Sequence, residues 1–259
     1  MKHALVRYFP GDRVPSTDVA GLVLQRFQAP EATTAGSWVA VAHALIPHSV
    51  APASIGQRFA ASRQAGIRSA WLSGALAGQR CLAVGVNLVF GPDLRLGVLS
   101  EDPDAVTALG RAWAMGLIAS GVTPALAPFP GMPAQTALTT AVSDSLGDLI
   151  LGAVVPVREL ATLTPFAIAA DVPYTDIASD DLDQSTSGID WAKTVTGFSG
   201  TLIGRGPGAI AAGCDWAICD AADLGALKDE NPVAAKPSTP RLLDSAALEQ
   251  ELSALMSQA

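Results

Sequence analysis

The segment AVGVNLVFGPDLRLGVLSEDPDAVTALGRAWAMGLIASGVTPALAPF, residues 83–129, decides the fold because it holds one whole repeating unit. Residues 83–94 form an apolar run typical of a strand that is buried on both faces. Residues 102–121 have helical spacing, with apolar positions on one face at Val106, Leu109, Trp113 and Leu117. A second apolar run follows at 122–129. A strand, a helix and a second strand predict parallel pairing in one sheet.

Similar apolar runs recur along the whole chain, and several are separated by helical patterns. They lie at 4–9, 21–27, 38–45, 83–94, 122–129, 166–174, 199–206 and 214–221. Eight strand candidates within about 220 residues favour a closed (β/α)8 TIM-type barrel over an open doubly wound sheet. Several connections are too short for a full helix. We therefore expect an α/β fold whose barrel is trimmed, with some shortened or missing helices.

The remaining helical patterns and one Pro-rich segment indicate how the chain is organised into domains. Besides 102–121, which Asp102 or Asp104 can cap, they cover 54–71, 134–153 and 245–258, and the apolar end of 134–153 could instead be a strand. The polar, Pro-rich segment 228–241 is typical of a linker. The expected organisation is a single barrel domain over 1–227. Residues 228–259 then form a Pro-rich linker and a C-terminal helix packed on or beside the barrel.

Composition excludes several classes of partner. Hydrophobic residues make up 49% and charged residues 15% of the 259 residues, and the net charge is −8. A large core is therefore available, and neither nucleic acid nor an anionic membrane is expected as a partner. The three cysteines, Cys81, Cys214 and Cys219, are too few and too scattered for a disulfide framework. With no apolar run of about 18 residues, we expect a cytoplasmic protein.

The stretch GFSGTLIGRGPG, residues 197–208, joins a strand to a glycine-rich loop that contains Arg205. A phosphate-binding loop needs free backbone N–H groups at a helix start, and Pro207 removes one of them. The spacing also fits neither common nucleotide-binding pattern. A plain strand-to-helix turn is therefore preferred over a phosphate site, and no cofactor is expected.

Metal and nucleophile motifs are also weak. His43 and His48 lie close together, but Pro47 would break a helix that aligned them and no Cys or acidic residue lies near in sequence. No metal site is therefore expected. The chain has no G-x-S-x-G motif. Asp93, Asp171 and Asp176 stand at or just beyond predicted strand ends, which form the working face of a barrel, although Asp is also common in loops and caps.

The ordered fragments of the chain resemble glycoside hydrolase family 3, most closely its bacterial cytoplasmic β-N-acetylglucosaminidases of peptidoglycan recycling. The resemblance covers most of residues 4–221. The fragments, in order, are GLVLQRFQAPEA, WVAVAHA, GVNLVFGPDL, DPDAVTALGRAWAMGLIASGV, APFPG, AADVPY, GFSGTLIGRG and AGCDWAI. The resemblance implies a (β/α)8 barrel, in agreement with the strand count.

The resemblance also locates the positions at which this family carries its working residues, and here those residues are replaced. The aspartate of the third strand falls on Ala42, and the Lys-His pair before Phe-Pro-Gly falls on Ala127 and Pro128. The acid/base histidine of the Asp-Ser-His motif falls on Leu146, and the nucleophilic aspartate falls on Arg205. The chain has no histidine after His48. The family's arginine-bearing loop after the fourth strand is shortened here to residues 95–101.

These replacements imply a protein that keeps the scaffold without its chemistry. Covalent glycoside hydrolysis needs a carboxylate nucleophile and a proton-transferring group, and a guanidinium stays protonated. We expect a catalytically inactive relative that binds a protein partner, such as itself or an active relative, or a small ligand such as a sugar or an anion; an oligomer is compatible with this. Two alternatives stay open: an enzyme with a rebuilt site using Asp93, Asp171, Asp176 or Arg205, and an ordinary active hexosaminidase.

Arg205 itself needs a partner if it stands at a strand end in a mostly apolar barrel, since an unpaired buried charge costs several kcal/mol. We expect it to pair with Asp171 or Asp93 at the same end of the barrel, where the strands finish, which we call the mouth. Alternatively, its planar guanidinium holds an anionic ligand.

Overall fold

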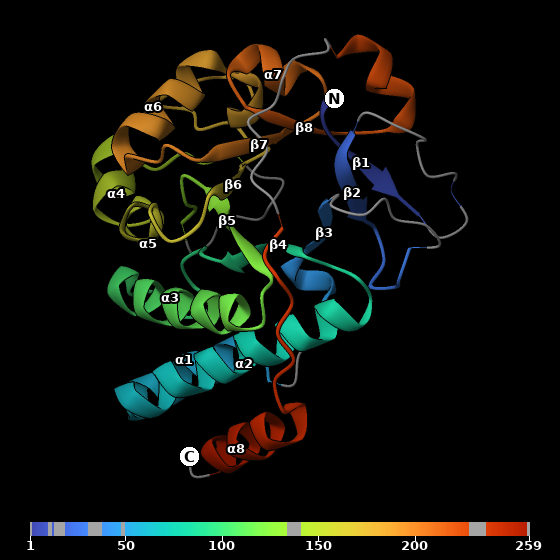
Figure 1. Cartoon of the computed structure of the whole chain (residues 1–259). Coiled ribbons are helices and arrows are strands. Elements are labelled where there is room, and N and C mark those ends of the chain that lie inside the picture. Colours follow the sequence, from blue (N-terminus) through green and yellow to red (C-terminus); the bar gives the residue numbers. More distant parts are fainter. Residues whose placement is uncertain are drawn as a thin grey trace.

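The computed structural model describes residues 2–9, 12, 19–30, 38–47, 50–133, 141–227 and 237–257. At its centre is a closed barrel in which each strand pairs in parallel with the next and β8 pairs with β1 (Figure 1). The strands are β1 (Lys2–Tyr8), β2 (Val19–Leu24), β3 (Trp38–Ala42), β4 (Leu88–Asp93), β5 (Thr123–Phe129), β6 (Phe166–Ala169), β7 (Thr201–Arg205) and β8 (Trp216–Cys219). Each overlaps one of the eight predicted runs, so the barrel prediction is confirmed.

Side chains fill the inside of the barrel, as in other barrels of eight strands. Aromatic rings from three strands meet there: Trp38 and Phe166 make an edge-to-face contact at a centroid distance of 5.0 Å, and the Phe166 ring lies 5.2 Å from that of Trp216. Aliphatic residues from the other strands, such as Leu88 and Ile203, complete this cluster. The interior of the barrel is therefore a packed core.

The helices pack around the outside of the barrel and vary widely in length. They are α1 (Pro52–Ala61), α2 (Arg63–Ala83), α3 (Pro103–Ala119), α4 (Leu146–Leu151), α5 (Val154–Leu160), α6 (Thr186–Thr196), α7 (Gly208–Ala212) and α8 (Ser245–Ser257). Short 3-10 helices occupy His43–Leu45, Leu182–Gln184 and Ala221–Ala226. Because α4, α5 and α7 have only 6, 7 and 5 residues, the prediction of a trimmed barrel is confirmed.

The longest predicted helices differ in how well they were placed. The predicted helix at 102–121 is α3, and Asp102 caps it by accepting the N–H of Asp104 at 3.0 Å. The single helix predicted at 54–71 is wrong: α1 and α2 are separate helices that meet at Ser62, whose hydroxyl caps α2. α2 also continues to Ala83, so the strand predicted from residue 83 begins only at Leu88. Of the helix predicted at 134–153, residues 134–140 lie outside the described residues.

The C-terminal helix α8 lies against α2, at the bottom of Figure 1. Its Leu252 is buried against Leu72 and Leu76 of α2. Part of the predicted linker, residues 228–236, lies outside the described residues. Residues 237–244 have no helix or strand and lead to α8. Within the described ranges, none of the helices is both long and apolar enough to span a membrane.

Candidate functional site

The candidate site is a small cavity at the end of the barrel where the strands finish. Its volume is about 160 Å³. Residues at the ends of five neighbouring strands, β3 to β7, line it, together with residues that follow them. The lining residues are Ala42, Phe90, Asp93, Arg95, Ala127, Pro128, Met132, Ile168, Ala169, Ala170, Asp171 and Arg205. Four positions at which the resemblance places working residues, Ala42, Ala127, Pro128 and Arg205, therefore surround one space.

Arg205 forms an ion pair with Asp171 across the mouth, from Nη1 to Oδ2. One of the two expected partners is therefore confirmed. The Arg205 side chain is 54% exposed, however, and that of Asp171 is 28% exposed. The expectation that Arg205 is a buried charge is wrong, because the last residue of β7 projects from the rim of the barrel, beyond its packed interior. A pair this exposed contributes only about 0–1 kcal/mol to stability.

Asp93, the other expected partner, binds Arg95 instead. Arg95 Nε donates to Asp93 Oδ1 at 2.9 Å, and Arg95 Nη2 donates to Oδ2 at 2.5 Å. The Arg95 backbone N–H adds a further bond to Oδ1 at 3.2 Å. This carboxylate raises the pKa of the Arg95 guanidinium above its ordinary value, mainly through the side-chain hydrogen bond. Both oxygens of Asp93 are thus already engaged by one neighbouring residue.

A buried carboxylate that the sequence patterns did not single out lies behind the mouth. Asp183, only 1% exposed, accepts the backbone N–H of Arg205 on Oδ2 at 2.7 Å. Gln184 Nε2 donates to Asp183 Oδ1 at 3.1 Å and to the Arg205 carbonyl oxygen at 2.6 Å. Burial raises the pKa of Asp183, although these hydrogen bonds oppose the shift. Asp183 and Gln184 therefore fix the backbone of the strand end from which Arg205 projects.

The glycine-rich loop after Arg205 is a strand-to-helix turn, as the sequence favoured. Gly206 has a φ of +69°, a left-handed conformation that suits glycine. Its N–H donates to the carbonyl oxygen of Ile218 at 2.7 Å, so it is not available to a phosphate. The helix that follows, α7, has only five residues.

Two residues singled out from the sequence lie away from the cavity. Asp176 is exposed in a turn beyond β6 and does not line the cavity. Leu146, at the position expected for the acid/base histidine, is the first residue of α4 and is 38% exposed. Ser145 before it caps α4 by accepting the N–H of Asp148 at 3.2 Å. This segment therefore forms a helix start and does not contribute to the cavity.

The histidine and cysteine side chains have structural surroundings. His43 follows β3, and its ring lies 4.4 Å from that of Trp113, while His48 lies outside the described residues. All three cysteines are buried and none of them forms a disulfide, as expected of core thiols. Over the part of the chain that the structure describes, no three His, Cys, Asp or Glu side chains lie close enough to hold a metal ion.

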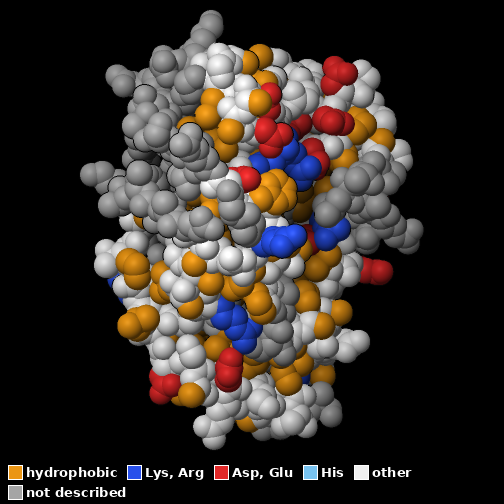
Figure 2. All heavy atoms as spheres, turned by 90° about the vertical axis from the view of Figure 1, so that its right-hand side faces the viewer, with side chains coloured by type: hydrophobic (Ala, Val, Ile, Leu, Met, Phe, Trp, Pro, Cys, Tyr) orange, Lys and Arg blue, Asp and Glu red, His pale blue; other side chains and the backbone are white. Residues whose placement is uncertain are grey.

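Charges of both signs are interspersed on the surface. On the side shown in Figure 2, basic side chains lie next to acidic ones, with apolar side chains scattered among them. The mouth follows the same pattern, with Arg205 beside Asp171 and Arg95 beside Asp93. Its four charged side chains therefore sum to no net charge.

Comparisons with known proteins identify the fold. No protein-family model matches the chain, and no curated protein matches its sequence. Native NagZ from Neisseria gonorrhoeae has a TM-score of 0.79 at 17% identity, over 98% of this chain and 97% of that one. A glycosyl hydrolase of family GH3 from Mycobacterium smegmatis has a TM-score of 0.63 at 18% identity, over 93% of this chain and 87% of that one. A family 3 β-N-acetylglucosaminidase from Paenibacillus has a TM-score of 0.60 at 15% identity, over 87% of this chain and 46% of that one.

This likeness extends over nearly the whole chain and agrees with the order of the sequence fragments. The chain has the barrel fold of the glycoside hydrolase family 3 β-N-acetylglucosaminidases.

Proposed function

We propose that this chain is a catalytically inactive relative of the family 3 β-N-acetylglucosaminidases and that it acts by binding a protein partner or a small ligand. The observation that carries the proposal is the arginine at the end of β7, where the resemblance places the nucleophile. A guanidinium has no lone pair to attack an anomeric carbon and stays protonated. Arg205 therefore cannot form a glycosyl-enzyme intermediate.

The two carboxylates at the mouth do not supply a substitute in this arrangement. Asp171 is paired with Arg205, and Asp93 is held through both oxygens by Arg95. A retaining mechanism needs one carboxylate free to attack and a second group to transfer a proton. Here each acid is neutralised by its own arginine, which favours a binding role over hydrolysis.

The size of the cavity supports the same proposal. Sites for small molecules usually enclose about 300–1,000 Å³. The mouth holds only about 160 Å³, lined largely by small and apolar side chains. A sugar is therefore a poorer candidate than a small anion or a protein partner that covers the rim. We place this role in the bacterial cytoplasm, in the setting of peptidoglycan recycling that the resemblance implies.

The test is a hydrolysis assay with 4-nitrophenyl β-N-acetylglucosaminide. We expect no release of nitrophenol above a blank without protein. The matched variant is Arg205→Ala, purified in the same way so that a contaminating hydrolase gives the same signal in both. Turnover that Arg205→Ala abolishes would contradict the proposal, and so would turnover that persists in the variant after repurification.

A rebuilt enzyme is the second candidate, favoured by one observation: Asp93 and Asp171 line the same cavity. If it operates, Asp93→Asn and Asp171→Asn should each reduce turnover of a glycoside by at least about 100-fold, as expected for loss of a catalytic carboxylate. An inactive protein shows no turnover for either variant to reduce.

A further inference from the structure

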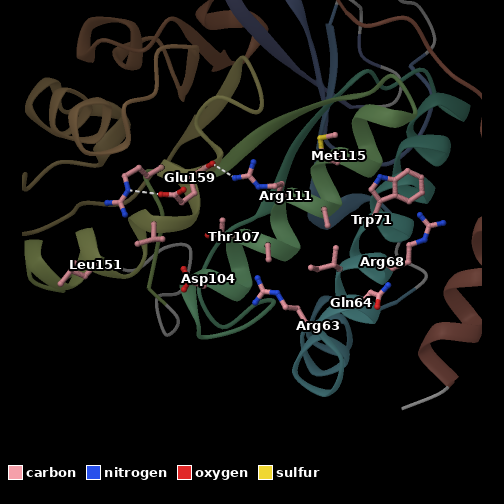
Figure 3. Close-up of a pocket in the computed structure, with 15 residues that line it drawn as sticks. Arg63, Gln64, Arg68, Trp71, Asp104, Thr107, Arg111, Met115, Leu151 and Glu159 are labelled. Carbon is pink, nitrogen blue, oxygen red and sulfur yellow. Dashed lines mark hydrogen bonds and ion pairs between the residues drawn. The ribbon is translucent and has the colours of Figure 1, made fainter.

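A second, much larger depression than the cavity at the mouth lies on the outer wall of the barrel. Its volume is about 1360 Å³. We call it the outer groove. Figure 3 shows that α2 and α3 supply most of the side chains that line it, with Leu151 and Glu159 from the region of α4 and α5 on the opposite side. It is separate from the cavity at the mouth, with which it shares no lining residue.

The lining residues follow helical stripes that run along the outer groove. On α3 they are Asp104, Thr107, Ala108, Arg111, Ala112 and Met115, with spacings of three and four residues. On α2 they include Gln64, Ile67, Arg68 and Trp71. The α3 stripe, from Asp104 to Met115, rises about 16 Å, or three turns, and the α2 stripe, from Arg63 to Trp71, rises about 12 Å, or two turns. The two stripes together match the contact surface of one more helix of about two to three turns.

The surface of the outer groove combines apolar and basic side chains. Met115 is 44% exposed and Leu151 is 80% exposed, so large apolar groups face solvent. Although the chain is acidic and has only 16 Lys and Arg residues, four arginines line the outer groove: Arg63, Arg68, Arg111 and Arg158. Only two acids line it, Asp104 and Glu159.

Among the described residues, two of these arginines have no carboxylate partner. Arg63 lies over the ring of Phe59, 5.2 Å from its centroid. Arg111 donates to the carbonyl oxygen of Glu159 at 2.8 Å. Within the described residues, neither forms an ion pair with a carboxylate. The complementary partner is therefore apolar on one side and acidic at its edges.

The chain already binds a helix of this chemistry on the neighbouring face of α2. In α8, Leu248, Leu252, Leu255 and Met256 pack on α2. Glu251 accepts two hydrogen bonds from Arg68, each 2.7 Å long, and Glu249 pairs with Arg80 at 3.0 Å. Arg68 stands between the two surfaces, because it also lines the outer groove. One side of α2 is thus covered by an acidic amphipathic helix, and the outer groove offers similar chemistry on its other side.

We propose that the outer groove binds an acidic amphipathic helix of a partner protein. The helix lies along α3 with its apolar stripe on Ile67, Ala108, Ala112 and Met115, and its carboxylates reach Arg63 and Arg111. This inference does not depend on the mouth being inactive. A hydrolytic chain could still use the outer groove, and an inactive chain could lack it.

The experiment uses the full chain and a fluorescein-labelled peptide with the sequence of residues 245–257, which is an acidic amphipathic helix. We expect saturable binding by fluorescence anisotropy with a Kd of about 100 µM or tighter, as suits a small interface. Arg111→Glu and Met115→Asp should each weaken binding at least about tenfold, through charge reversal and loss of apolar contact. Arg241→Glu, at an exposed arginine whose backbone lies near the opposite ends of α2 and α3, should leave binding unchanged.

Three results would overturn the proposal. The first is no saturable binding up to about 1 mM, or equal binding of a scrambled peptide. The second is binding that resists Arg111→Glu and Met115→Asp but increases in Leu252→Asp, because the peptide would then occupy the site of α8. The third is a dimer of the chain alone by light scattering that Arg111→Glu dissociates, because the occupant would then be a second copy.

Discussion

The mouth and the outer groove differ in how many of their arginines are paired: both at the mouth are, whereas in the outer groove only Arg68 and Arg158 pair with a carboxylate among the described residues. At the mouth, Arg205 and Arg95 each bind an aspartate, and the remaining cavity is about 160 Å³. Along the outer groove of about 1360 Å³, Arg63 and Arg111 have no carboxylate partner among the described residues. The end of the barrel that carries chemistry in this fold is therefore small and neutralised, while the outer wall is open and basic.

This contrast shows that the barrel fold does not by itself determine which residues stand at its mouth. The barrel closes through backbone pairing and a packed interior, and neither depends on which residue ends a strand. Arg205 stands at the exposed end of β7, outside that packed interior, so the residue at this position does not determine the scaffold. Function has to be argued for each surface from its own residues.

The largest expected effect concerns the wall that forms the outer groove. A Cβ on Gly116 of α3 would lie 2.0 Å from the carbonyl oxygen of Trp71 and 2.7 Å from the backbone N of Ala75, both on α2. Backbone cannot yield as a side chain can, so the helices must separate. We expect Gly116→Ala to destabilise the protein by about 3 kcal/mol, which corresponds to a fall in Tm of about 6–12 °C.

The control for Gly116→Ala is Gly147→Ala in α4. There the nearest atom to a Cβ is the hydroxyl of Ser145 at 3.8 Å. Because alanine favours helix by about 1 kcal/mol over glycine, Gly147→Ala should be neutral or slightly stabilising. If Gly116→Ala behaved in the same way in calorimetry, the close packing of α2 on α3 would be wrong.

The strands could be predicted from the sequence because buried parallel strands give apolar runs that do not depend on their neighbours. The break between α1 and α2 could not. Residues around Ser62 are good helix formers, and the corner depends on packing, since a Cβ on Gly66 of α2 would lie 2.3 Å from the Cα of Phe59 in α1. Only the three-dimensional arrangement shows that the chain turns there.

The site residues that end or follow strands could be predicted from the sequence, but the one whose role depends on burial could not. Arg205 and Asp171 end or follow neighbouring strands, β7 and β6, so their pairing could be foreseen. Arg95 was missed although it lies two residues after Asp93, a local signal that was available. Asp183 was missed because it is one of four aspartates between residues 180 and 190, and only the tertiary structure buries it.

The second-largest expected effect concerns Asp183, the buried carboxylate behind the mouth, and it depends on pH. Burial raises the pKa of Asp183 above its ordinary value of 3.8, and the nearby charges of Asp171 and Asp181 act in the same direction. The unfolded chain therefore releases this proton at lower pH than the folded chain. The stability contribution of Asp183 is complete below about pH 3.8 and is lost as pH rises through the higher folded pKa.

Asp183→Asn removes this titration while keeping an oxygen that can accept the N–H of Arg205. We expect the stability of the variant relative to the parent to improve between pH 4 and pH 7, by about 1.4 kcal/mol for each unit by which the folded pKa is raised. Urea unfolding of both proteins at each pH measures the difference, from which the other titrating groups cancel. A pH-independent difference would show that burial does not shift this carboxyl group.

The smallest effect is expected at the rim. Arg205→Ala removes a half-exposed ion pair but keeps the backbone bond from residue 205 to Asp183, so the loss should be at most about 1 kcal/mol and the fall in Tm at most about 4 °C. The difference should shrink further in 0.5 M NaCl, since salt screens exposed pairs at about this concentration. If the mouth also holds a small anion, added phosphate should raise the Tm of the parent and not of Arg205→Ala. A loss above about 2 kcal/mol would mean that the Arg205–Asp171 pair is structural after all. The mouth would then behave as part of the buried core, and its contrast with the outer groove could no longer be described as one between two exposed surfaces.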